Sequence, residues 1–275
     1  MVFLNGEFLP QNKAKISTLD RGFLFGDGVY EVIPVYNYKI FKLDEHLIRL
    51  ESSLKAIGIK NPFKIEKYQQ IITKLLKENP FKNQSIYLQI TRGVGKLRDH
   101  NFTNLEPTIY IRADELQIRN KSQLLKNNKA LIQTDIRWQN CYIKSISLLA
   151  NVLYAGIAKE NKVEEIILER GGVITEGASS NVFILSGEII KTPKISNNIL
   201  AGITREMVIQ SANLAQLKVE ECDIKTTELL SADEVWISSS TREIMAITQI
   251  NNTIFGSDSK AWNQVYDNFQ TLKNG

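Results

Sequence analysis

The chain has 275 residues, a net charge of +4, and 43% hydrophobic and 23% charged residues. Such values are typical of a globular protein with two modest domains or one large domain. Its lysines are scattered and do not form the basic stripe of a nucleic-acid-binding surface, and no apolar run reaches the roughly 20 residues of a membrane helix. We therefore expect neither a nucleic-acid partner nor a membrane partner.

Predicted strands and helices alternate in the first half of the chain. A hairpin is predicted around the turn at Asn5-Gly6, and Asp44 is predicted to cap a helix that ends near Gly58. The predicted strands are residues 2–5, 7–10, 29–36, 39–42, 85–91 and 108–112, and a second helix is predicted at residues 65–77. A glycine-containing loop between the last two strands carries Arg98 and His100.

The second half begins after a polar, charged stretch at residues 117–129. The strands predicted there are residues 130–138, 165–169, 173–176, 181–185, 188–191 and 234–238, and the helices are residues 147–161, 204–215 and 260–272. Interleaved strands and helices predict a mixed α/β or α+β fold. We expect an N-terminal domain at residues 1–118, a linker at 119–129 and a C-terminal domain at 130–275.

Cysteine and histidine are rare, which bears on compartment and metal binding. Cys141 and Cys222 are the only cysteines and lie far apart, as expected for reduced thiols in a cytoplasm. His46 and His100 are the only histidines and lack the spacing of metal ligands. We expect a cytoplasmic protein without a metal site.

Lys144 is the first candidate for chemistry. It lies between a predicted strand and an apolar helix, in Tyr142-Ile143-Lys144-Ser145-Ile146, whereas most other lysines alternate with polar residues. A desolvated lysine amine can form a Schiff base with a carbonyl group. The local sequence leaves two interpretations open: a lysine that extends its amine to water, or one that is bound covalently.

Glu176 is the second candidate, at the end of an apolar strand and before the small polar residues at 177–180. A buried carboxylate requires a cationic partner, and the protonated ring nitrogen of a pyridine cofactor would serve. The alternative, which the local sequence by itself favours, is a strand-end glutamate that faces water.

Candidates for phosphate binding occur at three places. Gly202-Ile203-Thr204-Arg205 opens a predicted helix, whose free N–H groups can bind phosphate or simply be capped. The hydroxyls of Ser239 and Ser240 follow a predicted strand. Arg49 can give a two-pronged phosphate contact or be solvated on its helix.

Arg98 and His100 alternate in the loop at residues 92–100. An arginine fork with one more donor beside it can hold a substrate carboxylate. An exposed polar loop without a ligand is the alternative.

Several motifs, taken in their order along the chain, resemble one enzyme family. They are Asp20-Arg21-Gly22 with Gly26-Asp27-Gly28-Val29-Tyr30-Glu31, then Glu45-His46-Leu47-Ile48-Arg49-Leu50, then Ile143-Lys144-Ser145, then Thr175-Glu176-Gly177 with Ser180-Asn181-Val182-Phe183, and Gly202-Ile203-Thr204-Arg205. This order resembles that of the fold-type IV pyridoxal-phosphate enzymes, over nearly the whole chain. Five motifs in one order are a more specific signal than any one of them.

The resemblance implies a role for each candidate. Lys144 would carry pyridoxal 5'-phosphate and move protons as general acid and base, and Glu176 would keep the cofactor ring nitrogen protonated. The phosphate would be held by Arg49, Ile203, Thr204, Ser239 and Ser240.

Within this family the chain is most similar to the D-amino-acid transaminases. The Arg98-Asp99-His100 loop and Tyr30 fit the group that traps the substrate α-carboxylate in these enzymes, and Asp135-Ile136-Arg137-Trp138 also resembles them. The implied reaction transfers the amino group of a D-amino acid such as D-alanine to a 2-oxo acid such as 2-oxoglutarate, giving pyruvate and D-glutamate. The loop from Thr91 to Arg98 is one residue longer than expected for these enzymes. This difference leaves open which substrate side chains the enzyme prefers.

The resemblance also implies a fold and a partner. Family members have a smaller N-terminal α/β domain and a larger C-terminal pseudo-barrel domain, and they are usually homodimers with the site at the subunit interface. Three alternatives remain: an L-branched-chain transaminase, an aminodeoxychorismate lyase on the same fold, and a non-catalytic binding protein. The last is disfavoured because a binding protein has no chemical need for Lys144 or Glu176.

Overall fold

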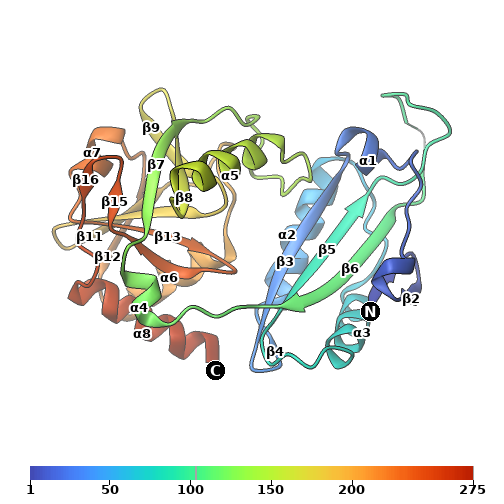
Figure 1. The fold of residues 1–275 in the computed structure, drawn as a ribbon, viewed down its shortest axis with the longest axis horizontal. Coiled ribbons are helices and arrows are strands. Elements are labelled where there is room, and N and C mark those ends of the chain that lie inside the picture. Colours follow the sequence, from blue (N-terminus) through green and yellow to red (C-terminus); the bar gives the residue numbers. More distant parts are fainter. Residues whose placement is uncertain (103, 275) are drawn as a thin grey trace. The chain divides into compact units, whose positions relative to one another are not determined.

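A computed structural model describes residues 1–102 and 104–274. The chain divides into two compact units, of which the first comprises Met1–Gln117 with Ile143–Leu148 and the second comprises Ile118–Tyr142 with Leu149–Gly275. Figure 1 shows the elements of both, labelled where there is room. Lys144 thus belongs by its contacts to the first unit, although it lies within the residues 130–275 that the sequence assigns to the C-terminal domain.

The first unit is built on a six-stranded antiparallel sheet with the strand order β2-β1-β6-β5-β3-β4. Its strands are β1 (Val2–Leu4), β2 (Glu7–Leu9), β3 (Gly28–Tyr36), β4 (Lys39–Ile40), β5 (Gln84–Thr91) and β6 (Thr108–Glu115). The predicted hairpin at the N-terminus is confirmed, with Asn5 in the left-handed region at φ 47° and Gly6 at φ 100° in its turn.

Two helices, α2 (Leu43–Ala56) and α3 (Ile65–Lys77), share one hydrophobic core with this sheet. Both were predicted because their apolar residues recur every three or four positions and so form one face. The predicted cap at Asp44 is wrong: α2 begins at Leu43 after Lys42, whose φ of 53° turns the chain one residue earlier. Asp44 lies instead in the first turn, where its charge interacts favourably with the helix dipole.

Two short helices of this unit were not predicted, namely η1 (Gln11–Lys13) and α1 (Arg21–Phe25). The second is fixed by Asp20, whose side chain accepts a hydrogen bond from the Gly22 N–H at 2.8 Å. Helices of this length are too short to give a hydrophobic period.

The segment around Lys144 extends the sheet at the free edge of β3. The Tyr30 N–H donates to the Lys144 carbonyl at 3.0 Å, and the Ile146 N–H donates to the Gly28 carbonyl at 3.0 Å. Val29 and Ser145 form an isolated bridge between these two bonds. Strand β4 pairs with Val35 and Tyr36 at the other end of β3, so this part of the edge is open to the Lys144 segment. Through these contacts, residues 143–148 belong to the first unit.

The second unit contains two five-stranded sheets, ordered β12-β11-β10-β13-β14 and β16-β15-β7-β8-β9. Their strands are β7 (Lys129–Thr134), β8 (Glu165–Arg170), β9 (Val173–Gly177), β10 (Asn181–Ser186), β11 (Ile189–Pro193), β12 (Lys218–Cys222), β13 (Glu234–Ser239), β14 (Glu243–Ile247), β15 (Gln249–Ile250) and β16 (Thr253–Ile254). The helices are α4 (Lys121–Leu125), α5 (Leu149–Asn161), α6 (Ile203–Leu214), α7 (Thr226–Leu230) and α8 (Lys260–Asn274). Helices α6 and α8 pack on each other, and α5 packs on β8 (Figure 1).

Several stretches of the second unit differ from the prediction. Elements β12, β14, β15, β16 and α7 were not predicted, and two further stretches have a structure other than the one expected. The strand predicted at residues 130–138 ends at Thr134, because Asp135 and Arg137 turn into a buried group of ion pairs. The polar stretch that includes residues 119–129 contains helix α4, whose Asn120 and Gln123 form a reciprocal capping box.

Two classes of feature are missing from the part of the chain that the structure describes. None of its helices combines the length and the apolar character that a membrane span requires. Over residues 1–102 and 104–274, no three His, Cys, Asp or Glu side chains gather where they could bind a metal ion.

Candidate active site

In the first unit, Lys144 is fixed by its backbone beside Tyr30. Its N–H donates to the Ser53 hydroxyl at 3.2 Å, and its carbonyl accepts the Tyr30 N–H. The Lys144 amine lies 4.2 Å from the centre of the Tyr30 ring, within the range of a cation–π contact. The structure therefore brings together two residues that the sequence assigned to catalysis and substrate binding.

Arg49 is held by a residue that the sequence reasoning missed. Glu31 follows Tyr30 on β3 and points to the opposite face, towards α2. It accepts hydrogen bonds from Nε and Nη2 of Arg49, both at 2.8 Å, and contacts Nδ1 of His46 at 2.8 Å. The available signal was a glutamate inside the otherwise apolar strand at residues 29–36.

The charge state of this group follows from burial and pairing. Burial raises the pKa of Glu31, but the charge of Arg49 and the hydrogen bonds from Arg49 and His46 outweigh it and hold the pKa at about 2. Burial lowers the pKa of His46, so its ring is neutral near pH 7 and Nδ1 carries the proton that is donated to Glu31. Glu31 therefore neutralises Arg49 and fixes its guanidinium.

Arg98 and His100 lie on the long loop between β5 and β6, and their side chains are exposed. Both contact Phe25 of α1: the guanidinium carbon of Arg98 and the ring of His100 each lie 5.2 Å from the centre of the Phe25 ring. The structure thus brings these two predicted residues together on one aromatic side chain.

In the second unit, Glu176 lies at the end of β9 and is 6% exposed by its side chain. Its Oε1 accepts a hydrogen bond from Nη1 of Arg137 at 2.5 Å. Its Oε2 accepts bonds from the Leu200 N–H at 3.0 Å and from the Asn181 amide at 3.1 Å. A carboxylate has about four lone-pair sites, so Oε1 keeps one for a further donor.

The electrostatics of Glu176 are governed by the same neighbours. Burial raises the pKa of the Glu176 carboxyl to about 7, against the lowering effect of Arg137 and the Leu200 N–H. Arg137 in turn makes two hydrogen bonds to Asp135, at 2.9 Å each, so a cation lies between two carboxylates. Arg137 was predicted only as part of a motif that resembles the family, and not as a residue of the site.

The predicted phosphate-binding residues of this unit lie at the start of α6 and at the end of β13. Helix α6 begins at Ile203 after Gly202, which gives no side-chain cap, so the N–H groups of Ile203 and Thr204 resemble an anion-binding helix start. A Cβ at position 202 would overlap the side-chain oxygen of Asn181. Asn181 is in turn the register partner of Ser238 on β13.

Ser239 and Ser240 continue from that point, into the turn between β13 and β14. Glu176 and the start of α6 thus both contact Asn181, and the two serines directly follow its register partner Ser238.

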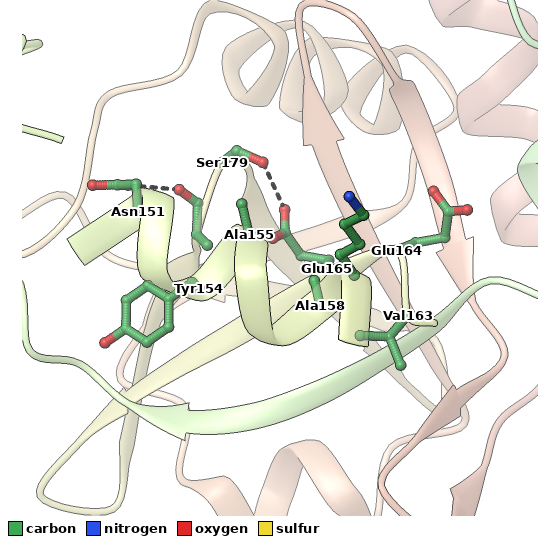
Figure 2. Close-up of a pocket in the computed structure, with 10 residues that line it drawn as sticks. Asn151, Tyr154, Ala155, Ala158, Val163, Glu164, Glu165 and Ser179 are labelled. Atoms are coloured by element: carbon green, nitrogen blue, oxygen red, sulfur yellow. Dashed lines mark hydrogen bonds between the residues drawn. The ribbon is translucent and has the colours of Figure 1, made fainter. Parts of the chain in front are cut away.

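A pocket of about 330 Å³ lies elsewhere in the second unit, along α5 (Figure 2). It is lined by Asn151, Tyr154, Ala155, Ala158, Lys159, Val163, Glu164, Glu165, Ala178 and Ser179. Its buried carboxylate, Glu165, already accepts hydrogen bonds from Arg242 at 2.6 Å and Ser180 at 2.7 Å. None of the site residues predicted from the sequence lines this pocket.

Comparison with known proteins identifies the family of this architecture. The family model described as amino-transferase class IV matches residues 28–250. A D-alanine aminotransferase of Listeria innocua is 39% identical over 91% of this chain and 87% of its own length. A D-alanine aminotransferase of Staphylococcus epidermidis is 40% identical over 91% of this chain and 89% of its own length.

Among solved structures, a branched-chain amino acid aminotransferase of Escherichia coli superimposes with a TM-score of 0.90. The match covers 99% of this chain and 94% of that one, at 22% identity. At this identity the similarity shows the fold alone, and it confirms the predicted mixed α/β class.

Proposed function

The chain belongs to the class IV aminotransferases, and on this premise we propose that it transfers the amino group of D-alanine to a 2-oxo acid such as 2-oxoglutarate. The observation that carries the proposal is the 39% identity to a D-alanine aminotransferase over 91% of the chain. The products would be pyruvate and D-glutamate, formed in two half-reactions that use the same site.

We propose pyridoxal 5'-phosphate as the cofactor, because the residues present fit its two charged ends. The uncapped start of α6 suits a phosphate, and the remaining lone pair on Oε1 of Glu176 suits a protonated ring nitrogen. When bound, this cofactor supplies an aldehyde that takes up the amino group and a ring that withdraws electrons from the substrate α-carbon.

The other cofactor contacts belong to the same proposal. The phosphate would be held by the fixed guanidinium of Arg49, by the N–H groups of Ile203 and Thr204, and by the hydroxyls of Ser239 and Ser240. The pairing of Nε and Nη2 of Arg49 with Glu31 supports its part, because a guanidinium that is already oriented loses little freedom when it binds a phosphate through its other N–H groups.

Lys144 would have two tasks, to hold the cofactor covalently and to carry the proton that leaves the substrate α-carbon. Its fixed backbone supports both, since the amine must reach the same atoms in each cycle. The adjoining Tyr30 ring limits the positions of the free amine.

The substrate carboxylate would be bound by Tyr30, Arg98 and His100. The guanidinium fork of Arg98 matches a carboxylate, and the imidazole of His100 adds one donor. Because both side chains are exposed in the single chain, we propose that they complete the site of a second copy in a homodimer.

Exposed apolar side chains support the homodimer. On α5, Leu149, Val152 and Leu153 are 73%, 63% and 52% exposed. On the loop between β5 and β6, Leu97 is 75% exposed. Exposed apolar residues that gather on one helix, as these three do on α5, are typical of subunit interfaces. Sedimentation of the purified protein at several concentrations tests the dimer directly.

The cofactor proposal is tested by borohydride reduction followed by peptide mass spectrometry. The protein purified with the cofactor should be yellow, and reduction should add the cofactor mass to the Lys144 peptide. Lys144→Ala should abolish turnover, whereas Lys60→Ala, at an exposed lysine outside the proposed site, serves as the matched control and should retain it. A protein that stays colourless with added cofactor would contradict the proposal and would favour a non-catalytic binding protein.

A further inference from the structure

The side chain of Arg21 is almost fully buried, at 7% exposure, although it starts the short helix α1. Its Nε donates to Asp27 at 2.8 Å. Its Nη1 donates to the Asp99 carbonyl at 2.5 Å, and its Nη2 donates to the His100 carbonyl at 3.1 Å. One guanidinium therefore holds the backbone of the loop that carries Arg98 and His100.

The charge balance around Arg21 accounts for its orientation. Asp27 also binds Arg92, at 2.7 Å from Nε and 2.9 Å from Nη2, so two guanidinium groups share one carboxylate. Arg92 directs its other N–H groups to the carbonyls of Ile57 and Gly58, at the end of α2. The charge of Arg21 that Asp27 does not balance is met by the loop carbonyls, which are good acceptors for a charged donor.

The side chains of the loop are aligned by Phe25, one turn after Arg21. The Arg21 guanidinium lies 4.8 Å from the centre of the Phe25 ring, and the Arg98 guanidinium lies 5.2 Å from it. The His100 ring is 5.2 Å away, tilted by 40°. Phe25 therefore keeps Arg98 and His100 on the same side of the loop, while Arg21 fixes the backbone beneath them.

We propose that Arg21, supported by Phe25, is a positioning residue that holds the Arg98–His100 loop in the conformation that binds the substrate carboxylate. The inference rests on the proposed role of Arg98 and His100. It adds that carboxylate affinity is set in part by a buried residue that does not contact the substrate. Lysine cannot replace Arg21, because its compact ammonium lacks the planar fork that reaches Asp27 and two carbonyls together.

The test uses propionate, which offers the enzyme a carboxylate without an amino group. Its inhibition constant against D-alanine is measured for the holoenzyme and for the variants Arg21→Lys and Phe25→Leu. We expect Arg21→Lys to raise this constant about tenfold, the effect of losing one charged hydrogen bond. Phe25→Leu should raise it as well, because it removes the ring that contacts Arg98 and His100. Arg92→Lys is the matched control, because Arg92 also donates to Asp27 but directs its other N–H groups to the carbonyls of Ile57 and Gly58. Its contact with the loop is with the ring of Phe102.

Two further readouts separate positioning from a general loss of stability. The affinity for pyridoxal phosphate should stay within about twofold in both variants, and the KM for D-alanine should rise more than kcat falls. If Arg21→Lys does not fold, Phe25→Leu decides, since it leaves the buried ion group intact. An equal rise of the inhibition constant in Arg92→Lys would mean general loosening and would overturn the inference.

Arg98→Ala distinguishes failure of this inference from failure of the proposed function. If Arg98→Ala weakens propionate binding but Arg21→Lys and Phe25→Leu do not, the positioning role is wrong and the carboxylate role stands. If Arg98→Ala leaves propionate binding unchanged, the carboxylate role is wrong, and the inference fails with it.

Discussion

Replacing Glu31 by glutamine should destabilise the first unit and change how stability depends on pH. Glu31 is 0% exposed and neutralises Arg49 through two hydrogen bonds, with a third contact to His46. Glutamine keeps the shape but removes the charge, which leaves the mostly buried guanidinium without its counter-ion. Removing one partner of a buried ion pair costs about 3–5 kcal/mol.

The pKa of Glu31 gives a second value for what its charge contributes to the free energy of unfolding. Its value of about 2 lies about 2.5 below the ordinary glutamate pKa of 4.5, which corresponds to about 3 kcal/mol of stability. Because the folded-state pKa is depressed, this stability is present in full above pH 4.5 and is lost as the pH falls towards 2. Wild-type protein should lose about 1 kcal/mol of it by pH 4 and about 2 kcal/mol by pH 3.

Urea unfolding, followed by far-UV circular dichroism, measures both effects, because this signal includes the sheet and helices of the first unit. The gap in unfolding free energy between wild type and Glu31→Gln should be largest near pH 7 and should narrow as the pH falls to 3. Glu45→Gln on the same helix is the control, since its side chain is 46% exposed and its loss should cost less than about 1 kcal/mol. A gap that stays constant from pH 7 to pH 3 would refute the reasoning.

Three further substitutions probe the second unit. Arg137→Met should cost about 3–5 kcal/mol and raise the pKa of Glu176 further, so urea unfolding should show a greater loss of stability between pH 6 and pH 8 than in wild type. Gly202→Ala should cost about 1–3 kcal/mol and weaken pyridoxal phosphate in a titration, because the added methyl overlaps Asn181. Asn128→Ala should cost about 1–3 kcal/mol in urea, because the amide of Asn128 is buried and donates to three carbonyls; a loss below about 0.5 kcal/mol would contradict this.

The sequence predicted best those elements whose pattern follows from burial on one face. Helix α3 was predicted with its bounds because Tyr68, Ile71, Ile72 and Leu75 form a buried stripe at helical spacing. Strand β12 escaped prediction because its sequence Lys-Val-Glu-Glu-Cys has no apolar alternation and lies at a sheet edge. Helix α4 was not predicted because it is short, and its capping box at Asn120 lies in a polar stretch without a hydrophobic period.

Some residues of the candidate site were likewise predicted from the sequence, and others were not. Family motifs identified Lys144 and Glu176 as candidates, and the structure gives each a fixed, specific environment. Glu31, Arg137 and Arg21 were not assigned, because each acts through a partner distant in sequence. The partner of Arg21 is a loop backbone 78 or more residues away, and no local pattern encodes such a contact.

Single half-reactions of the cofactor-loaded protein with D-alanine and with L-leucine test the proposed D-amino-acid transamination. D-Alanine should bleach the yellow colour quickly and release pyruvate, and adding 2-oxoglutarate should restore the colour and yield D-glutamate. Rapid bleaching by L-leucine with none by D-alanine would contradict D-alanine transamination and would favour a branched-chain aminotransferase.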